Sequence, residues 1–216
     1  LRPIGLFPTL IRVWMRARLP VAQQWEMEHA DPSLFGGKGM GAQRAAWTAA
    51  FSAETASYAG DKYAIALLDL VKAFETVPHW VLVEAAKLKG YPIALLKLSL
   101  AAYRLARTIG VDGVYSRLIV ATRGITAGSG FATSELRVLM LDLIFSLQAR
   151  WANIIIVKVY VDDLTLTARA KYGLAAKRVA EHRPNALGGR QSRPRKAPRQ
   201  QSRVAGAIAN ATTALL

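Results

Sequence analysis

The chain has 216 residues, 52% of them hydrophobic and 20% charged, so its composition excludes a wholly disordered protein. The length predicts one domain or slightly more, and because the chain begins with Leu1 we expect it to be a piece of a longer protein. Cysteine is absent, which excludes disulfides and thiolate metal sites and leaves carboxylates and three histidines as ligands. The net charge of +15 favours a polyanionic partner, either nucleic acid or an anionic membrane surface. No leader or membrane-spanning run is visible, so we expect a soluble chain.

The first sixty residues are predicted to hold two helices and a glycine-rich loop. Thr9 is expected to cap a helix that Pro20 interrupts, with an apolar face formed by Leu10, Val13, Trp14 and Ala17. The glycine-rich loop at residues 35–41 leads into an alanine-rich helix from Ala42 to Tyr58. Such a loop can approach a phosphate closely, but its spacing is not that of a Walker motif, so plain flexibility stays the alternative.

Three aspartates stand at the ends of apolar runs with strand composition. Residues 63–68 lead into Asp69, and residues 154–161 lead into Asp162 and Asp163, after which a second apolar run follows. The latter pattern predicts a hairpin between buried strands with the two acids at its tip. Adjacent carboxylates at such a place repel and lose hydration, and a bound divalent cation is the usual remedy. We therefore expect Asp69 to meet Asp162 and Asp163 at one end of a sheet.

Between these runs, the sequence predicts helices and one further hairpin. A helix is expected from Pro78 to Gly90 and another after Pro92, and Asp112-Gly113 joins two strand-like runs as a hairpin turn. The loop at residues 123–130 leads into a long helix with an apolar stripe formed by Leu136, Leu139, Met140, Leu143, Ile144 and Leu147.

The chain changes character after the Asp162-Asp163 hairpin. A last helix is expected from Lys171 to Glu181. From Arg183 onward there are seven basic residues and no acidic ones, so residues 183–216 are predicted to form a basic, low-complexity, disordered tail. Subtracting those seven charges from +15 leaves +8 on residues 1–182, so the remainder is basic on its own.

Five segments follow one another in the order of the sequence blocks of a polymerase family. They are Arg2-Pro3-Ile4-Gly5-Leu6, Phe35-Gly36-Gly37-Lys38-Gly39, residues 69–79 as motif A, residues 124–129 as motif B, and Tyr160-Val161-Asp162-Asp163 as motif C. Over residues 1 to about 168 the chain resembles the palm of a reverse transcriptase of the non-LTR retrotransposon or group II intron kind. A single motif is weak evidence, whereas the order and spacing of all five are specific.

The resemblance implies an α+β fold in which an antiparallel palm sheet is backed by helices, with part of the fingers and without the thumb. It assigns residues 1–60 to partial fingers and residues 61–182 to the palm. Such an enzyme joins nucleotides to a primer 3′ end with two metal ions. By the family's pattern Asp69 and Asp162 bridge the ions, the Leu70 carbonyl adds a ligand, and Asp163 is the auxiliary acid. Two Mg²⁺ ions are expected, with Mn²⁺ as an alternative.

The same resemblance assigns residues to the incoming nucleotide. Arg2 matches the position that contacts the triphosphate, Leu70 lies beside the metals, and Phe74 matches the aromatic that excludes a ribose 2′-hydroxyl. Gly128 and Ser129 match the loop beneath the nucleotide and the template. The implied partners are an RNA template with a DNA primer and deoxynucleoside triphosphates. No membrane is implied, and retroelement analogy favours an intracellular place, in the nucleus or the cytoplasm.

The chain departs from the family at motif B, where Thr126-Ala127 replaces the usual Pro-Gln, and at Glu75, where an aspartate is more usual. Three other interpretations therefore stay open. The first is a catalytically inactive, nucleic-acid-binding remnant of a retroelement. The second is an RNA-dependent RNA polymerase, because residues 129–133 faintly resemble motif B of that family. The third is a reading frame that is not used as a stable protein. The sequence implies no oligomeric state.

Overall fold

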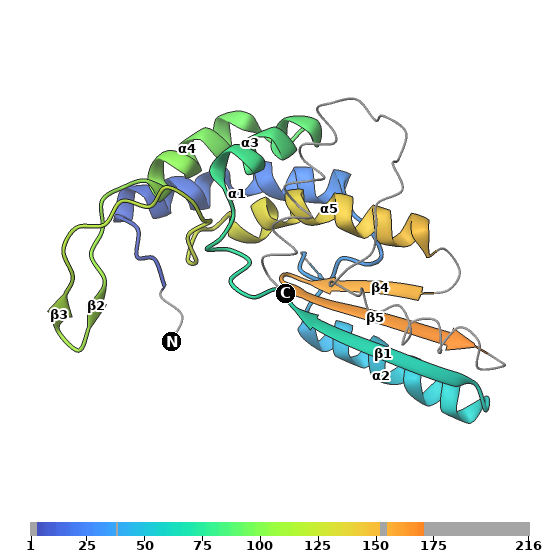
Figure 1. Ribbon diagram of the computed structural model, residues 1–216. Helices are drawn as coiled ribbons and strands as arrows, with labels where there is room; N and C mark the ends of the chain where they lie inside the picture. The colour runs from blue at the N-terminus through green and yellow to red at the C-terminus, as the bar shows by residue number, and fades with distance from the viewer. Residues whose placement is uncertain (1–3, 38, 152–154, 171–216) are drawn as a thin grey trace, which may run out of the picture. The chain divides into compact units, whose positions relative to one another are not determined.

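The computed structural model describes residues 4–37, 39–151 and 155–170 (Figure 1). In chain order the elements are α1 (Thr9–Glu28), α2 (Ala42–Tyr58), β1 (Lys62–Asp69), α3 (His79–Leu88), α4 (Ile93–Tyr103), β2 (Gly110–Val111), β3 (Val114–Tyr115), α5 (Ala132–Arg150), β4 (Ile155–Tyr160) and β5 (Asp163–Ala170). The fold is α+β with a small antiparallel sheet, as the sequence predicts. Arg2, the expected helix at residues 171–181 and the tail at residues 183–216 lie outside the described residues.

The described chain divides into two compact units. One contains residues 4–30 and Val71–Leu141, and the other contains Asp31–Leu70 and the described part of residues 142–170. The predicted division into fingers and palm stays a prediction. Within the described residues, none of the helices combines the length and the apolar character that crossing a bilayer requires.

Aromatic side chains make several of the packing contacts of the first unit. The Trp25 indole N–H donates to the Lys89 carbonyl at 2.8 Å, and the ring meets Tyr91 edge-on at 5.1 Å between centroids. Trp14 meets Phe131 in the same edge-on manner at 5.6 Å. These contacts join α1 to the residue that precedes α5 and to the segment between α3 and α4, and aromatic rings bury a large area in such contacts.

The structure corrects two expectations for α1. The helix continues through Pro20 instead of ending there, and Thr9 is its first residue, not its cap. Leu10 and Val13, expected on one apolar face of the helix, are 81% and 60% exposed. The buried residues of α1 are Met15, Ala22 and Trp25. Because these lie on both sides of Pro20, packing outweighs the roughly 3 kcal/mol that proline costs inside a helix.

Two local predictions for the first unit are confirmed. β2 pairs with β3 in antiparallel fashion, and the turn residues Asp112 and Gly113 have φ of 50° and 81°, as a type I′ hairpin turn requires. α3 begins directly after Pro78, and Gly90 follows its end with φ of 63°. The proline and glycine therefore mark the helix boundaries as the sequence pattern indicates.

The second unit contains a three-stranded antiparallel sheet in the order β1-β5-β4, with α2 running along β1 (Figure 1). β5 is the central strand and pairs with β1 over its full length. The side chains that alternate on one face of β4 and β5 form the core of this unit; they are Val157, Val159, Leu164 and Ala168. The sheet thus brings the end of β1 next to the β4–β5 hairpin.

Candidate active site

The predicted Asp-Asp hairpin is formed by β4 and β5. Tyr160 pairs with Asp163, so Val161 and Asp162 make a two-residue turn. Val161 has φ of 59°. A β-branched residue adopts this conformation only under strain, at a cost of about 1–3 kcal/mol. Such strain persists where neighbouring contacts hold the backbone, and it is found mostly at functional sites.

The glycine-rich loop supplies such contacts. The Phe35 N–H donates to the Val159 carbonyl at 2.8 Å, and the Val159 N–H donates to the Ser33 carbonyl at 2.7 Å. A Cβ on Gly36 would lie 3.3 Å from Val161 Cγ2 and 3.4 Å from the Val161 nitrogen. This loop, for which the sequence leaves phosphate contact and plain flexibility open, packs against the strained turn.

Asp69 and Asp163 face each other across β1 and β5. The Leu70 N–H donates to the Asp162 carbonyl at 3.4 Å. Because this bond flanks the Asp69–Asp163 pair, the two residues form a non-hydrogen-bonded pair of the antiparallel ladder. In such a pair the Cα atoms lie about 4.5 Å apart and both side chains are on the same face of the sheet. Both side chains are exposed. The structure thus brings Asp69 to the hairpin, as the strand pattern predicts, while the roles of these acids stay predictions.

Asp162 lies in the turn and is half-buried. Within residues 4–37, 39–151 and 155–170, no three His, Cys, Asp or Glu side chains are grouped closely enough to hold a metal ion. The described side chains therefore do not form the expected three-carboxylate cage. The Asp69–Asp163 pair alone still fits a hard cation, because it supplies carboxylate oxygens and the cation would remove a like-charge repulsion.

In the first unit, the end of motif A is hydrogen-bonded to motif B. The Ile125 N–H donates to the Phe74 carbonyl and the Gly124 N–H donates to the Val77 carbonyl, each at 2.7 Å. Gly124 has φ of 92°, and a Cβ there would lie 2.8 Å from the Glu75 carbonyl oxygen. Only glycine fits this approach. The backbone of Phe74, the predicted ribose-excluding residue, is thus fixed, and its side chain is half-buried.

Motif B also contacts the N-terminal block. The Gly5 N–H donates to the Ala127 carbonyl at 2.7 Å. Gly128 has φ of 106°, and a Cβ there would lie 2.5 Å from the Gly5 carbonyl oxygen. These bonds join the segments of Phe74, Gly128 and Gly5, so three of the family-like blocks meet in this unit.

A buried polar cluster holds Ser129. The Tyr103 hydroxyl lies 2.8 Å from Ser129 Oγ and 2.6 Å from Glu135 Oε2. The tyrosine has one proton, so when it donates to the carboxylate it accepts from the serine. The Ser129 hydroxyl is therefore engaged inside the protein, and this residue shapes the loop instead of presenting its hydroxyl to a ligand.

Glu135 is a residue that sequence analysis missed. It is wholly buried in α5. Burial raises the pKa of Glu135 to about 7, while the Tyr103 hydrogen bond and the nearby Ser99 hydroxyl act in the opposite direction. Burial also raises the pKa of Tyr103. An acid inside an apolar helical run is the signal that could have revealed it.

Among the comparisons with known proteins, only solved structures give matches, and the likeness is distant. No protein-family model matches the chain, and no curated protein matches it. Among solved structures, the chain is similar to apo telomerase from Candida tropicalis truncated from the C-terminal domain, with a TM-score of 0.45 and 14% sequence identity. The match covers 80% of this chain and 36% of that one.

Gly128→Ala is expected to lower the free energy of unfolding by about 1–3 kcal/mol, because it combines a positive φ with an overlap on the Gly5 carbonyl. Urea denaturation measures this change. Gly130→Ala is the matched control, since a Cβ there meets only Met15 Cβ at 3.6 Å. Equal effects from the two variants would contradict a tight contact between Gly5 and Gly128.

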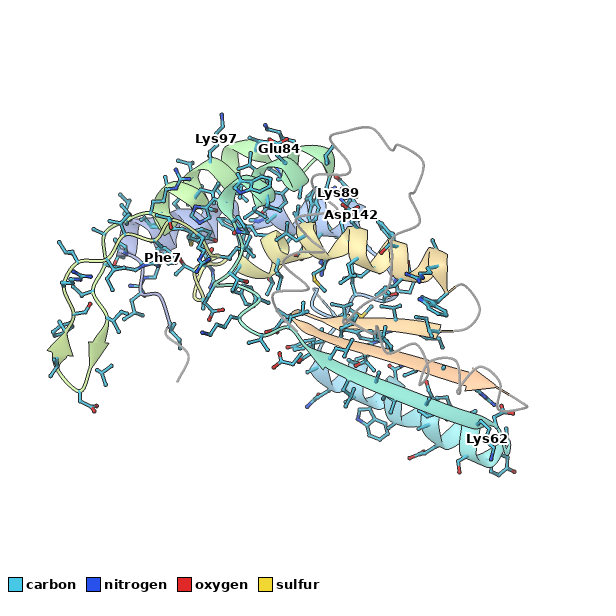
Figure 2. All side chains as sticks on the ribbon, in the orientation of Figure 1. Phe7, Lys62, Glu84, Lys89, Lys97 and Asp142 are labelled. Atoms are coloured by element: carbon cyan, nitrogen blue, oxygen red, sulfur yellow. The ribbon has the colours of Figure 1, made fainter. Side chains whose placement is uncertain are left out.

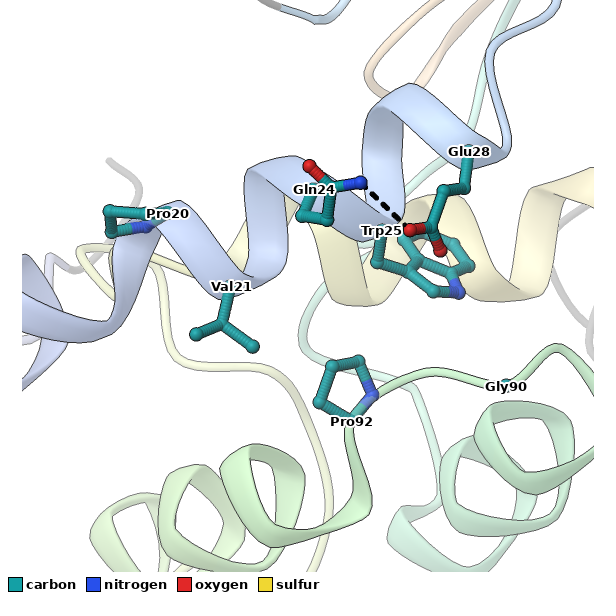
Figure 3. Close-up of a pocket in the computed structure, with 7 residues that line it drawn as sticks. All are labelled: Pro20, Val21, Gln24, Trp25, Glu28, Gly90 and Pro92. Carbon is teal, nitrogen blue, oxygen red and sulfur yellow. Dashed lines mark hydrogen bonds between the residues drawn. The ribbon is translucent and has the colours of Figure 1, made fainter.

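One pocket of the first unit lies apart from these residues. It is lined by Pro20, Val21, Gln24, Trp25, Glu28, Gly90 and Pro92 (Figure 3). The Gln24 side chain donates to Glu28 Oε1 at 2.8 Å along its rim. None of the predicted site residues lines this pocket, and its two polar side chains engage each other.

Proposed function

We propose that this chain is an RNA-directed DNA polymerase domain, or part of one, which adds deoxynucleotides to a primer 3′ end with two Mg²⁺ ions. The observation that supports this most is the facing of Asp69 and Asp163 across β1 and β5, with Asp162 in the adjoining turn. Without a cation, two like charges directly opposite each other destabilise a sheet. The arrangement is understandable if a cation binds there.

Asp69, Asp162, Asp163 and the Leu70 carbonyl would hold the ions. When bound, the ions lower the pKa of the attacking hydroxyl and stabilise the leaving pyrophosphate. Leu67 and Ile65 alternate with Asp69 on the same side of β1 and are 74% and 47% exposed. The part of this side of β1 next to Asp69 is therefore open to a primer end that approaches the carboxylates.

Arg2, Phe74, Gly128 and Ser129 would bind the deoxynucleoside triphosphate. Phe74 excludes the ribose 2′-hydroxyl, and its fixed backbone supports that role because steric exclusion needs a rigid wall. Gly128 and Ser129 form the floor of the nucleotide site through their backbone. The net charge of +8 on residues 1–182 favours the RNA template and the DNA primer as partners.

A primer-extension assay with the full chain tests this proposal. Wild type is expected to extend a DNA primer on an RNA template with deoxynucleotides in Mg²⁺. Phe74→Val is expected to weaken discrimination against ribonucleotides by about 10-fold or more, since it removes the wall beside the 2′ position. Preferred use of ribonucleotides by wild type would indicate an RNA-dependent RNA polymerase instead.

A second candidate, an inactive nucleic-acid-binding remnant, is favoured by Ala127 in place of the family's glutamine and by the lack of a three-acid group among the described side chains. It predicts RNA binding that weakens with salt but does not respond to Mg²⁺ or to Asp69→Asn. Folded protein that binds RNA in this manner, without metal-dependent extension, would support the remnant over the polymerase.

A further inference from the structure

The helix α2 packs inward through small side chains alone and has its large apolar side chains on the outside. The half-buried or buried positions are Ala45, Ala49, Ser52, Ala53, Thr55 and Ala56. By contrast, Trp47, Phe51 and Tyr58 are 77%, 69% and 97% exposed. This reverses the usual arrangement of a surface helix, in which the large apolar residues face the core. Clustered exposed apolar side chains of this size mark an interaction surface.

The large exposed apolar residues form one straight stripe. The stripe consists of the three aromatic residues and two charged ones, and successive members are alternately three and four positions apart along α2. They are Arg44, Trp47, Phe51, Glu54 and Tyr58. This is the spacing of the a and d positions in a coiled coil, which lie on one face of a helix. The stripe is therefore a seam of the kind that packs against a second helix.

The charges on this seam are complementary to themselves. In an antiparallel pair of identical helices, the numbers of any two residues that lie opposite each other, one from each copy, have the same mean throughout the interface. Trp47 and Phe51 have a mean of 49, and so do Arg44 and Glu54. The register that stacks the aromatic residues across the interface therefore also forms an ion pair at each end of it.

We propose that α2 is the contact of a homodimer, in which two copies pair antiparallel through this seam. Trp47 and Phe51 of one copy pack on the partner's Phe51 and the partner's Trp47, and Arg44 pairs with the partner's Glu54. The contact is isologous, so it closes after two copies. Glu54 inside the stripe disfavours a nucleic acid as its occupant, because a phosphate backbone would meet an acid there. This inference is independent of the proposed polymerase activity.

Charge reversal tests the register. Sedimentation velocity of the full chain is expected to show dimers at concentrations above roughly 10 µM, since a seam of this length gives a weak interface. Arg44→Glu places like charges opposite each other twice, as does Glu54→Arg, and each is expected to raise the dimer dissociation constant by at least about 10-fold. The double variant R44E/E54R restores opposite charges and is expected to dimerise like wild type.

Lys97→Glu is the matched control, with the same charge change on the exposed side of α4 (Figure 2). It should leave the dissociation constant unchanged. Because Arg44 and Glu54 are both exposed, the single variants should keep the wild-type far-ultraviolet circular dichroism. A wild type that stays monomeric at every concentration overturns the proposal. So does a double variant that dimerises no better than the single variants.

Discussion

Asp69→Asn is expected to have opposite effects on catalysis and on stability. Primer extension should fall by more than about 100-fold, because even a residue behind a metal ligand contributes 10- to 100-fold. In the absence of metal, the free energy of unfolding should rise by roughly 0.2–1 kcal/mol, because the substitution removes one of two like charges at the Asp69–Asp163 pair. Few structural substitutions change these two quantities in opposite directions.

Mg²⁺ titration measures the same site without catalysis. Wild type should gain about 2.7 kcal/mol of stability at 100 times the dissociation constant, and Asp69→Asn should gain much less. Asp112→Asn is the control, since Asp112 is an exposed acid in the β2–β3 turn where asparagine also tolerates a positive φ. If Asp69→Asn destabilises the metal-free protein and Mg²⁺ leaves wild type unchanged, the facing acids are not a cation site.

The parts of this site that could be predicted are those that depend on neighbours in sequence. Strand composition and the adjacent acids predict the hairpin at Asp162, and the apolar run before Asp69 predicts its strand. The pairing of β1 with β5 follows because each of these strand-like segments needs a neighbouring strand for its backbone hydrogen bonds. The strained φ of Val161 and the support from Gly36 could not be predicted, since they come from a contact between residues more than a hundred positions apart.

The errors in α1 and the unexpected surface of α2 have a common cause. Periodicity shows that a helix has an apolar stripe, but it does not say which neighbour covers it. Leu10 and Val13 form a regular stripe and are exposed, while Met15 and Trp25 are buried by packing of the first unit. In α2, alanines give the buried face because the helix lies close to β1, so the aromatic residues point outward. Tertiary packing overrides the local pattern in both helices.

Glu135 is expected to make the protein less stable as the pH rises from about 4.5 to about 7. In the folded protein its pKa is raised to about 7 from an ordinary value near 4.5. Within that range the unfolded chain has lost the proton and the folded chain keeps it, so unfolding becomes easier with increasing pH. Each pH unit contributes about 1.4 kcal/mol, which gives a total loss on the order of 3 kcal/mol that stays constant above pH 7.

Glu135→Gln tests this because the amide keeps the shape and accepts the Tyr103 hydrogen bond without ionising. Its free energy of unfolding should vary less with pH across this range than that of wild type, and at pH 8 it should exceed that of wild type. Glu84→Gln, at a partly exposed position that pairs with Lys87, should keep the wild-type pH profile. Tyr103 and Tyr91 cannot account for the effect, since their pKa values are raised far above this range. A profile unchanged by Glu135→Gln would show that another group carries the pH dependence and that Glu135 is already ionised in the folded protein.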